Sequence, residues 1–186
     1  MQLTVAKVGG SLFDLPDLRD RLGQWAATLP GPVLFVPGGG DGVNVIRGFD
    51  RLYGLGEEKS HWLALRVLTI NAQILGLLLG AEVVPDATLA SPVTILDPYQ
   101  FCLADEGRPG ALPHGWRVTS DAIAARMAEF ASAELVLLKS VDLPRNTDWA
   151  AAARAGLVDE TVDAIVRRSN VPVQWVNLRQ LPVAPR

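Results

Sequence analysis

Several short segments of this 186-residue chain are apolar at nearly every position, and they constrain its fold more than any other feature. Residues 33–36 read VLFV and residues 135–138 read LVLL, so neither segment has a polar side chain to turn toward water. Strands of this kind are buried on both faces, as in parallel sheets that helices cover on each side. The runs therefore predict an α/β protein with a mostly parallel central sheet.

Segments with helical periodicity alternate with these strands. In residues 14–29, leucines and Trp25 recur at helical spacing, and Pro30 ends the pattern. Further helices are expected at 41–53, 57–80, 120–131 and within 148–168, and further strands at 2–8, 82–84, 93–96 and 173–177. This alternation predicts a three-layer α/β/α sandwich. Because no linker divides the sequence, residues 1–186 are expected to form a single domain.

The segment from Asp97 to Gly115 interrupts the alternation. It is rich in turn residues, among them Pro98, Pro109 and Pro113. Long connections of this kind are often functional loops. The segment is therefore expected to be a flexible lid or loop.

Composition excludes several classes of function. The net charge of −3 offers no basic surface for nucleic acid. Cys102 is the only cysteine and His61 and His114 are the only histidines, so no disulfide and no metal site is expected. No signal peptide is recognisable, and the apolar run near 74–81 is too short to span a membrane. The protein is expected to be cytoplasmic, without a membrane or nucleic-acid partner.

The stretch VAKVGGSL places Lys7 on an expected strand and follows it with Gly9, Gly10 and Ser11. A buried ammonium group needs a partner, and glycine N–H groups just past a strand are open to an anion such as phosphate. The ordinary alternatives are a lysine that extends to water and a plain tight turn. Other residues at the same edge of the sheet decide between these interpretations.

Two further strands end in residues of the same kind. Gly38, Gly39 and Gly40 follow one strand directly, and Lys139 follows another. Ligands of parallel α/β proteins bind beyond the carboxyl ends of the strands, so these loops are expected to meet. Neither the P-loop pattern nor the dinucleotide-binding pattern fits the glycines. Lysines and glycine N–H groups together neutralise and cradle phosphate, which indicates a small-molecule phosphoryl transferase.

Four motifs, in order along the chain, resemble those of the amino acid kinase family. They are Lys7-x-Gly9-Gly10-Ser11, Pro37-Gly38-Gly39-Gly40, Thr119-Ser120-Asp121-x-Ile123-Ala124-Ala125 and Leu138-Lys139-Ser140-Val141-Asp142. The resemblance covers about the whole chain. It implies an α/β/α sandwich with ATP and magnesium at one half of the carboxyl edge and the phosphoryl acceptor at the other.

The resemblance also implies roles for the matching residues. Lys7 would bind the transferred phosphoryl group, Lys139 would stabilise charge on the bridging oxygen, and Asp121 would orient both lysines. A simple helix cap remains the alternative for Asp121. The nucleotide would be bound by Gly9, Gly10, Ser11, Ser120, Ser140 and Asp142, and the acceptor by Gly38, Gly39 and Gly40.

A closer resemblance is to a subgroup of short aspartokinase-related kinases that act on a phosphate monoester in methanofuran biosynthesis. It is carried by Asp41-x-x-Asn44-x-x-Arg47-x-x-Asp50, Ser60-His61-Trp62, Trp116-x-Val118-Thr119-Ser120-Asp121, Gly156-Leu157-Val158-Asp159 and Trp175-Val176-Asn177-Leu178-Arg179. In this view Arg47 would bind the acceptor's phosphate, Asp50 would bind its amine, and His61 would reach the same pocket. The alternatives are a solvated Arg47–Asp50 ion pair and a half-buried histidine.

Other functions stay open from the sequence. The acceptor could be another small acid or phosphate, such as an amino acid or isopentenyl phosphate, and the chain could be a nucleotide-binding storage or regulatory protein. The chain is short for the family, and no later lysine motif for ATP follows Asp142. The helix expected at 57–80 is apolar around much of its circumference, which suits full burial or a subunit contact. Because family members usually dimerise there, a homodimer is expected.

Overall fold

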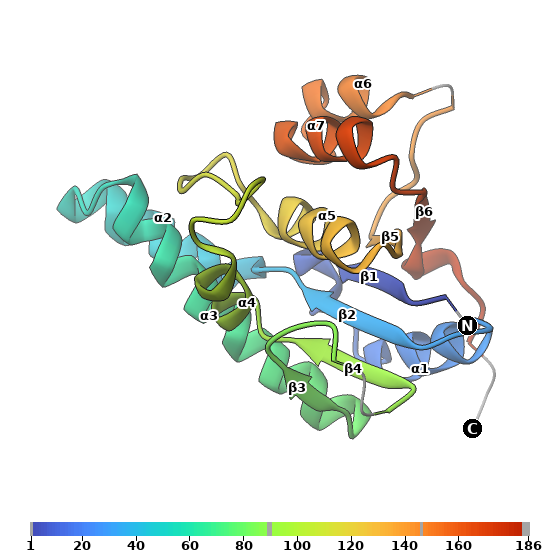
Figure 1. Cartoon of the computed structure of the whole chain (residues 1–186). Coiled ribbons are helices and arrows are strands. Elements are labelled where there is room, and N and C mark those ends of the chain that lie inside the picture. Colours follow the sequence, from blue (N-terminus) through green and yellow to red (C-terminus); the bar gives the residue numbers. More distant parts are fainter. Residues whose placement is uncertain (1, 89–90, 146, 184–186) are drawn as a thin grey trace.

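The computed structural model describes residues 2–88, 91–145 and 147–183, and a six-stranded sheet lies at its centre (Figure 1). The strands are β1 Thr4–Val8, β2 Val33–Pro37, β3 Glu82–Val84, β4 Val93–Leu96, β5 Glu134–Lys139 and β6 Val173–Asn177. They lie in the order β3-β4-β2-β1-β5-β6, and each neighbouring pair is parallel. The predicted parallel sheet is confirmed.

Helices cover both faces of the sheet, as Figure 1 shows for α1 and α5. The helices are α1 Leu18–Ala27, α2 Gly40–Tyr53, α3 Glu57–Leu79, α4 Pro98–Asp105, α5 Ser120–Ala131, α6 Trp149–Arg154 and α7 Glu160–Ser169, with short 3₁₀ turns η1 Gly10–Leu12 and η2 Leu178–Gln180. Along β1, Val5 packs in the core cluster that contains α5, whereas Ala6 and Val8 pack in the cluster that contains α1. This alternation of a fully buried strand confirms the predicted three-layer sandwich.

The segment from 97 to 115 differs from its prediction as a flexible loop, because residues 98–105 form helix α4. Asp97 is the N-cap of this helix, and its carboxylate accepts hydrogen bonds from the N–H groups of Tyr99 and Gln100. Pro98 occupies the first helical position, where a proline's missing N–H costs nothing. The proline therefore starts a helix here instead of breaking one.

Helix α3 is long and apolar enough to span a membrane by length and composition, and it alone passes that test within the described residues. Long core helices pass it too, so the finding is weak evidence for a membrane. One side of α3 is buried against the rest of the fold, including Leu65, Leu68 and Leu75. Ile70 and Leu77 on its other side are 59% and 85% exposed.

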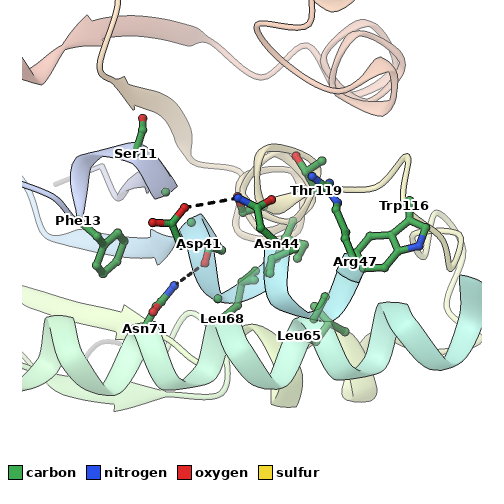
Figure 2. A pocket seen from close by; sticks show the side chains of 18 of the residues that line it. Ser11, Phe13, Asp41, Asn44, Arg47, Leu65, Leu68, Asn71, Trp116 and Thr119 are labelled. Atoms are coloured by element: carbon green, nitrogen blue, oxygen red, sulfur yellow. Dashed lines mark hydrogen bonds between the residues drawn. The ribbon is translucent and has the colours of Figure 1, made fainter. Parts of the chain in front are cut away.

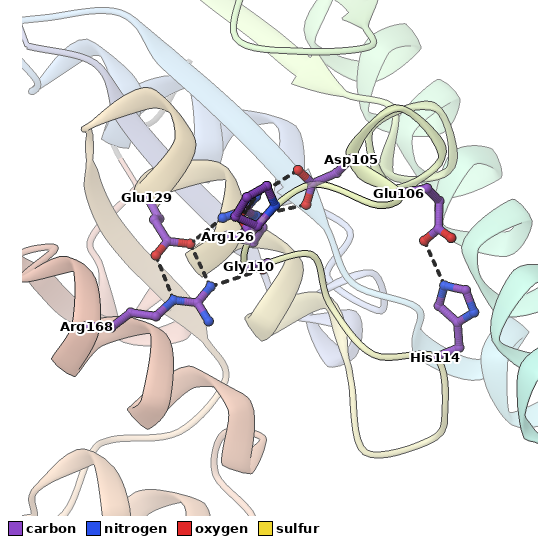
Figure 3. A network of polar contacts seen from close by, with 8 residues as sticks. Asp105, Glu106, Gly110, His114, Arg126, Glu129 and Arg168 are labelled. Carbon is purple, nitrogen blue, oxygen red and sulfur yellow. Dashed lines mark hydrogen bonds and ion pairs between the residues drawn. The ribbon is translucent and has the colours of Figure 1, made fainter.

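A network of ion pairs fastens the segment after α4 to α5 and α7 (Figure 3). Two guanidinium nitrogens of Arg126 lie 2.8 and 2.9 Å from the two carboxylate oxygens of Asp105. Arg126 also donates to Glu129, and Arg168 donates to both Glu129 and the carbonyl oxygen of Gly110. The part of the predicted lid that follows α4 is thus held by hydrogen bonds and ion pairs to α5 and α7.

Asp105→Ala is expected to lower the free energy of unfolding by about 3–5 kcal/mol, because it leaves the buried Arg126 guanidinium without its main partner. Asp163→Ala is the matched control, since it removes a carboxylate that pairs with the exposed Arg167 on α7. The loss of that surface pair should cost less than about 1 kcal/mol. Denaturant unfolding measures both, and equal effects would contradict the importance of the buried network.

Candidate active site

Two of the chain's three lysines meet at one buried carboxylate, at the carboxyl edge of the sheet. Lys7 Nζ lies 2.8 Å from Asp121 Oδ1, and Lys139 Nζ lies 2.8 Å from Asp121 Oδ2. At most 12% of any of these three side chains is exposed. With both lysines protonated and the carboxylate ionised, the cluster carries one net positive charge, which suits an anionic ligand.

The local fold explains how the three residues meet. Parallel pairing places Lys7 beside Leu137 on β5, so Lys139 lies just beyond it at the same edge. Asp121 is the second residue of α5, and the Thr119 side chain caps this helix by accepting the Asp121 N–H. Because the Thr119 side chain caps α5, the carboxylate of Asp121 is free to face the lysines. The helix cap that the alternative interpretation assigned to Asp121 is thus made by Thr119.

Burial and charge act against each other in this cluster. Burial alone would raise the pKa of Asp121, but the charges of Lys7 and Lys139 outweigh it and hold the pKa below its usual value. Burial and, next, the charge of Lys7 lower the pKa of Lys139 to about 8, against the opposing attraction of Asp121. The Lys7 contact to Asp121 Oδ1 is an ion pair without hydrogen-bond geometry, so this buried oxygen accepts no directed hydrogen bond.

Three residues from the C-terminal part of the chain support the cluster. Lys139 Nζ donates to the Leu157 carbonyl oxygen at 2.7 Å and lies 5.2 Å from the centre of the Trp175 ring. Asp159 caps α7 and accepts from the Thr119 hydroxyl and N–H groups, which fixes the start of α5. Burial raises the pKa of Asp159. The subgroup motifs contain all three residues, but they were not predicted as site residues.

The two glycine loops touch beside the lysines. A Cβ atom on Gly10 would lie 2.3 Å from the Gly40 nitrogen, and one on Gly38 would lie 2.4 Å from the Gly10 nitrogen. No side chain fits at either position without moving the backbone. The loops after β1 and β2 therefore depend on glycine for their close approach.

A cavity of about 810 Å³ opens beside Lys7 and these loops (Figure 2). Of the predicted site residues, those that line it are Lys7, Gly10, Ser11, Gly39, Gly40, Arg47, His61 and Ser120. The others lie outside its lining: Gly9, Gly38, Asp50, Asp121, Lys139, Ser140 and Asp142. Leu65, Leu68 and Ile123 supply an apolar part of its wall.

Arg47 enters the cavity without a carboxylate partner among the described residues. Its guanidinium group lies 5.1 Å from the centre of the Trp116 ring. Asp50 instead accepts the Trp116 indole N–H at 2.7 Å and the Gly56 N–H at 2.9 Å. The described residues therefore contain no Arg47–Asp50 ion pair, which was the alternative expected from the sequence. Asp50 instead holds Trp116 at the cavity wall.

His61 lies at the border between the cavity and the segment after α4. Its ring is buried and stacks on His114, with ring centres 5.1 Å apart. Burial and the nearby His114 lower the pKa of His61, so the ring is mainly neutral at pH 7. His114 in turn contacts Glu106 at 2.8 Å (Figure 3).

On the other side of the cluster, side chains link the loops after β1, β5 and β6. The Ser11 and Ser140 hydroxyl groups lie 2.8 Å apart. The two carboxylate oxygens of Asp142 accept hydrogen bonds from the Asn177 and Gln180 side chains. Of the predicted nucleotide residues, Gly10, Ser11 and Ser120 line the cavity, whereas Gly9, Ser140 and Asp142 lie outside its lining.

Comparisons with known proteins find kinases that are similar to this chain in sequence or in fold. No protein-family model matches the chain. A curated relative from Methanocaldococcus jannaschii, [5-(aminomethyl)furan-3-yl]methyl phosphate kinase, is 24% identical over 146 residues, which is 74% of this chain. The match spans 66% of that kinase, just under two thirds of its length.

Solved structures share the fold over nearly the whole chain. Uridylate kinase from Archaeoglobus fulgidus superimposes with a TM-score of 0.64 at 17% identity, covering 95% of this chain and 90% of that one. An isopentenyl phosphate kinase superimposes with a TM-score of 0.60 at 11% identity, covering 95% and 91%. These findings confirm the resemblance to the amino acid kinase family at the level of the fold: the chain has the fold of these kinases.

Proposed function

We propose that this protein is a kinase that transfers the γ-phosphoryl group of ATP to the phosphate of a small phosphate monoester. The observation that carries the proposal is the meeting of Lys7 and Lys139 at the buried Asp121, beside a cavity edged by two glycine loops. Phosphoryl transfer requires positioning and positive charge around the transferred group, with no covalent nucleophile from the protein. The cluster supplies both requirements.

Each lysine has a distinct task in this mechanism. Lys7 lines the cavity and would hold the transferred phosphoryl group, whereas Lys139 would stabilise the charge that develops on the bridging oxygen. Asp121 touches both ammonium groups and keeps them from separating. Proton transfer is not required of any of the three.

ATP would lie on the side of Ser11 and Ser140. Its phosphates would contact the backbone of Gly9 and Gly10 and the hydroxyl groups of Ser11, Ser120 and Ser140, with Asp142 at the outer border. Within the described residues no three metal-binding side chains gather closely enough to hold an ion. Magnesium would therefore arrive bound to ATP, where it would neutralise phosphate charge.

The acceptor would occupy the cavity. Arg47 would bind its phosphate, and the N–H groups of Gly39 and Gly40 would contact the same group. The Gly38 carbonyl and Asp50 would act indirectly, by holding the loop and Trp116 in place. His61 would contact the body of the acceptor as a neutral ring.

The name of the curated relative supports an acceptor related to (aminomethyl)furanylmethyl phosphate, and hence a role in methanofuran-type cofactor synthesis. The apolar wall of Leu65, Leu68 and Ile123 gives isopentenyl phosphate as a second candidate. Both are phosphate monoesters, so the unpaired Arg47 serves either. We also propose that the protein is cytoplasmic and forms a homodimer, and the exposed apolar side of α3 supports the homodimer.

The proposal is tested by an ADP-release assay with MgATP and a panel of acceptors. The panel contains the furan phosphate, isopentenyl phosphate, UMP, aspartate and glutamate. Turnover confined to phosphate monoesters is the expected result. Turnover with amino acids alone would keep a kinase but discard this acceptor class, and ATP binding without any turnover would favour a storage or regulatory protein.

Arg47→Met is expected to raise KM for the preferred phosphate monoester by about 10- to 100-fold, because charge-assisted hydrogen bonds of about 1.5–3 kcal/mol are lost. Arg51→Met is the matched control on the same helix, since Arg51 is exposed and lies outside the cavity lining. Steady-state kinetics of both variants measure the effect. An unchanged KM in Arg47→Met would remove Arg47 from the acceptor site.

A further inference from the structure

A single amide on the apolar helix α3 holds the second glycine loop. Asn71 Nδ2 lies 2.7 Å from the Gly38 carbonyl oxygen and 3.1 Å from the Gly39 carbonyl oxygen. Figure 2 shows the Asn71 side chain pointing from α3 toward the loop that precedes α2. None of the sequence motifs contains this residue.

The direction of these two carbonyl groups fixes the direction of the next two N–H groups. In a planar trans peptide the C=O and the following N–H point opposite ways, and the described chain has no cis peptide. Because the carbonyls of Gly38 and Gly39 face Asn71, the N–H groups of Gly39 and Gly40 point away from α3. Both glycines line the cavity together with Lys7.

The N–H groups of Gly39 and Gly40 have no hydrogen-bond acceptor among the described residues. Helix α2 likewise has no side-chain cap within this part of the chain. The preceding Gly38 N–H is held by the Val8 carbonyl oxygen at 2.8 Å, which fixes the start of the loop. Three consecutive glycines have wide conformational freedom, so without a second anchor their peptide planes can rotate.

We infer that Asn71 is a positioning residue for phosphoryl transfer: its amide fixes two peptide planes of the glycine loop so that the N–H groups of Gly39 and Gly40 face the acceptor's phosphate. The inference rests on the proposed function. It gives a physical reason for an amide at position 71, on the side of α3 that faces the glycine loop. Gln73, two residues further on, is exposed and lacks this contact.

The kinetic test uses two variants that lose the donor in different ways. Asn71→Leu has a similar size and no polar group, whereas Asn71→Asp keeps the shape and turns a carboxylate toward two carbonyl oxygens. Both are expected to lower kcat/KM for the phosphate monoester by about 10- to 100-fold, with KM for ATP nearly unchanged. Gln73→Leu is the control and should stay within about twofold of wild type. Wild-type kinetics in both Asn71 variants would overturn the inference.

A second readout does not depend on turnover. Inorganic phosphate added to ¹⁵N-labelled wild-type protein should shift the amide signals of Gly39 and Gly40, and folded Asn71→Leu should need at least about tenfold more phosphate for the same shift. Equal titrations in the two proteins, or no shift in wild type, would overturn the inference. If the shifts depend on Asn71 but no acceptor on the panel is phosphorylated, the proposed function fails while the role of Asn71 in anion binding stands.

Discussion

Lys7→Met is expected to reduce kcat for phosphoryl transfer by about 100- to 1,000-fold, the effect of removing one preorganised charge from a transition state. Lys7 is the one lysine of the cluster that lines the cavity, so its ammonium group has the most direct access to the transferred phosphoryl group. Methionine keeps the length and apolar stem of the side chain, so β1 should pack as before. Turnover at saturating ATP and acceptor measures the change.

Lys59→Met is the matched control for this variant. Lys59 is the third lysine of the chain, lies exposed near the start of α3 and has no part in the cluster. The control should retain wild-type kcat, and Lys7→Met should still bind ATP. A Lys7→Met protein with wild-type turnover would contradict the proposed mechanism.

Asp121→Asn should produce the second large effect, because it leaves two buried ammonium groups without their shared carboxylate. We expect kcat to fall by about 100-fold or more and the free energy of unfolding to fall by about 3–5 kcal/mol at pH 6. Asp148→Asn is a suitable control, since Asp148 caps α6 through a side-chain oxygen that asparagine retains. A variant that matches this control in kcat and stability would contradict the role of Asp121.

The pH dependence of the same site has a definite sign. Lys139 must be protonated to stabilise negative charge, and its pKa is lowered to about 8, so wild-type kcat/KM should fall as the pH rises through about 8. In Asp121→Asn the fall should begin at lower pH, because the carboxylate that favours the charged lysine is gone. A wild-type kcat/KM that stays flat up to pH 10 would contradict the assignment of Lys139.

Linkage gives a separate expectation for stability. The folded pKa of Lys139 lies below that of an unfolded lysine, so between about pH 8 and 10.5 the unfolded chain binds more protons than the folded one at this site. The contribution of Lys139 to stability therefore rises with pH across that window. For the same reason the destabilisation in Asp121→Asn should be smaller at pH 9 than at pH 6.

The parts of the fold that depend on local sequence patterns could be predicted from the sequence. Helix α5 has the predicted bounds of 120–131, because Thr119 caps it and its apolar face is regular. The apolar runs identified the central strands, and parallel pairing then required their loops to meet at one edge. That rule places Lys7 and Lys139 at the same edge of the sheet, whereas the position of Asp121 between them was expected only from the resemblance to the amino acid kinase family.

Features that depend on contacts between distant residues could not be predicted. The start of α4 is different, because it is a local signal that was misread: Pro98 was interpreted as a loop residue, although the preceding Asp97 caps α4. Trp116 and Asp50 are 66 residues apart, so nothing local indicates that Asp50 binds an indole instead of Arg47. Asn71 is 33 residues from Gly38, and its role follows only from the orientation of α3 beneath the glycine loop.

Phosphorus NMR of the reaction mixture tests the central claim most directly. Wild-type protein is incubated with MgATP and each phosphate monoester, and the phosphorus signals of acceptor and product are followed over time. We expect the acceptor's signal to be replaced by two coupled diphosphate signals, at the rate at which ADP appears. ADP that accumulates only with inorganic phosphate, or an acceptor signal that persists while ATP remains intact, would contradict the proposed kinase activity.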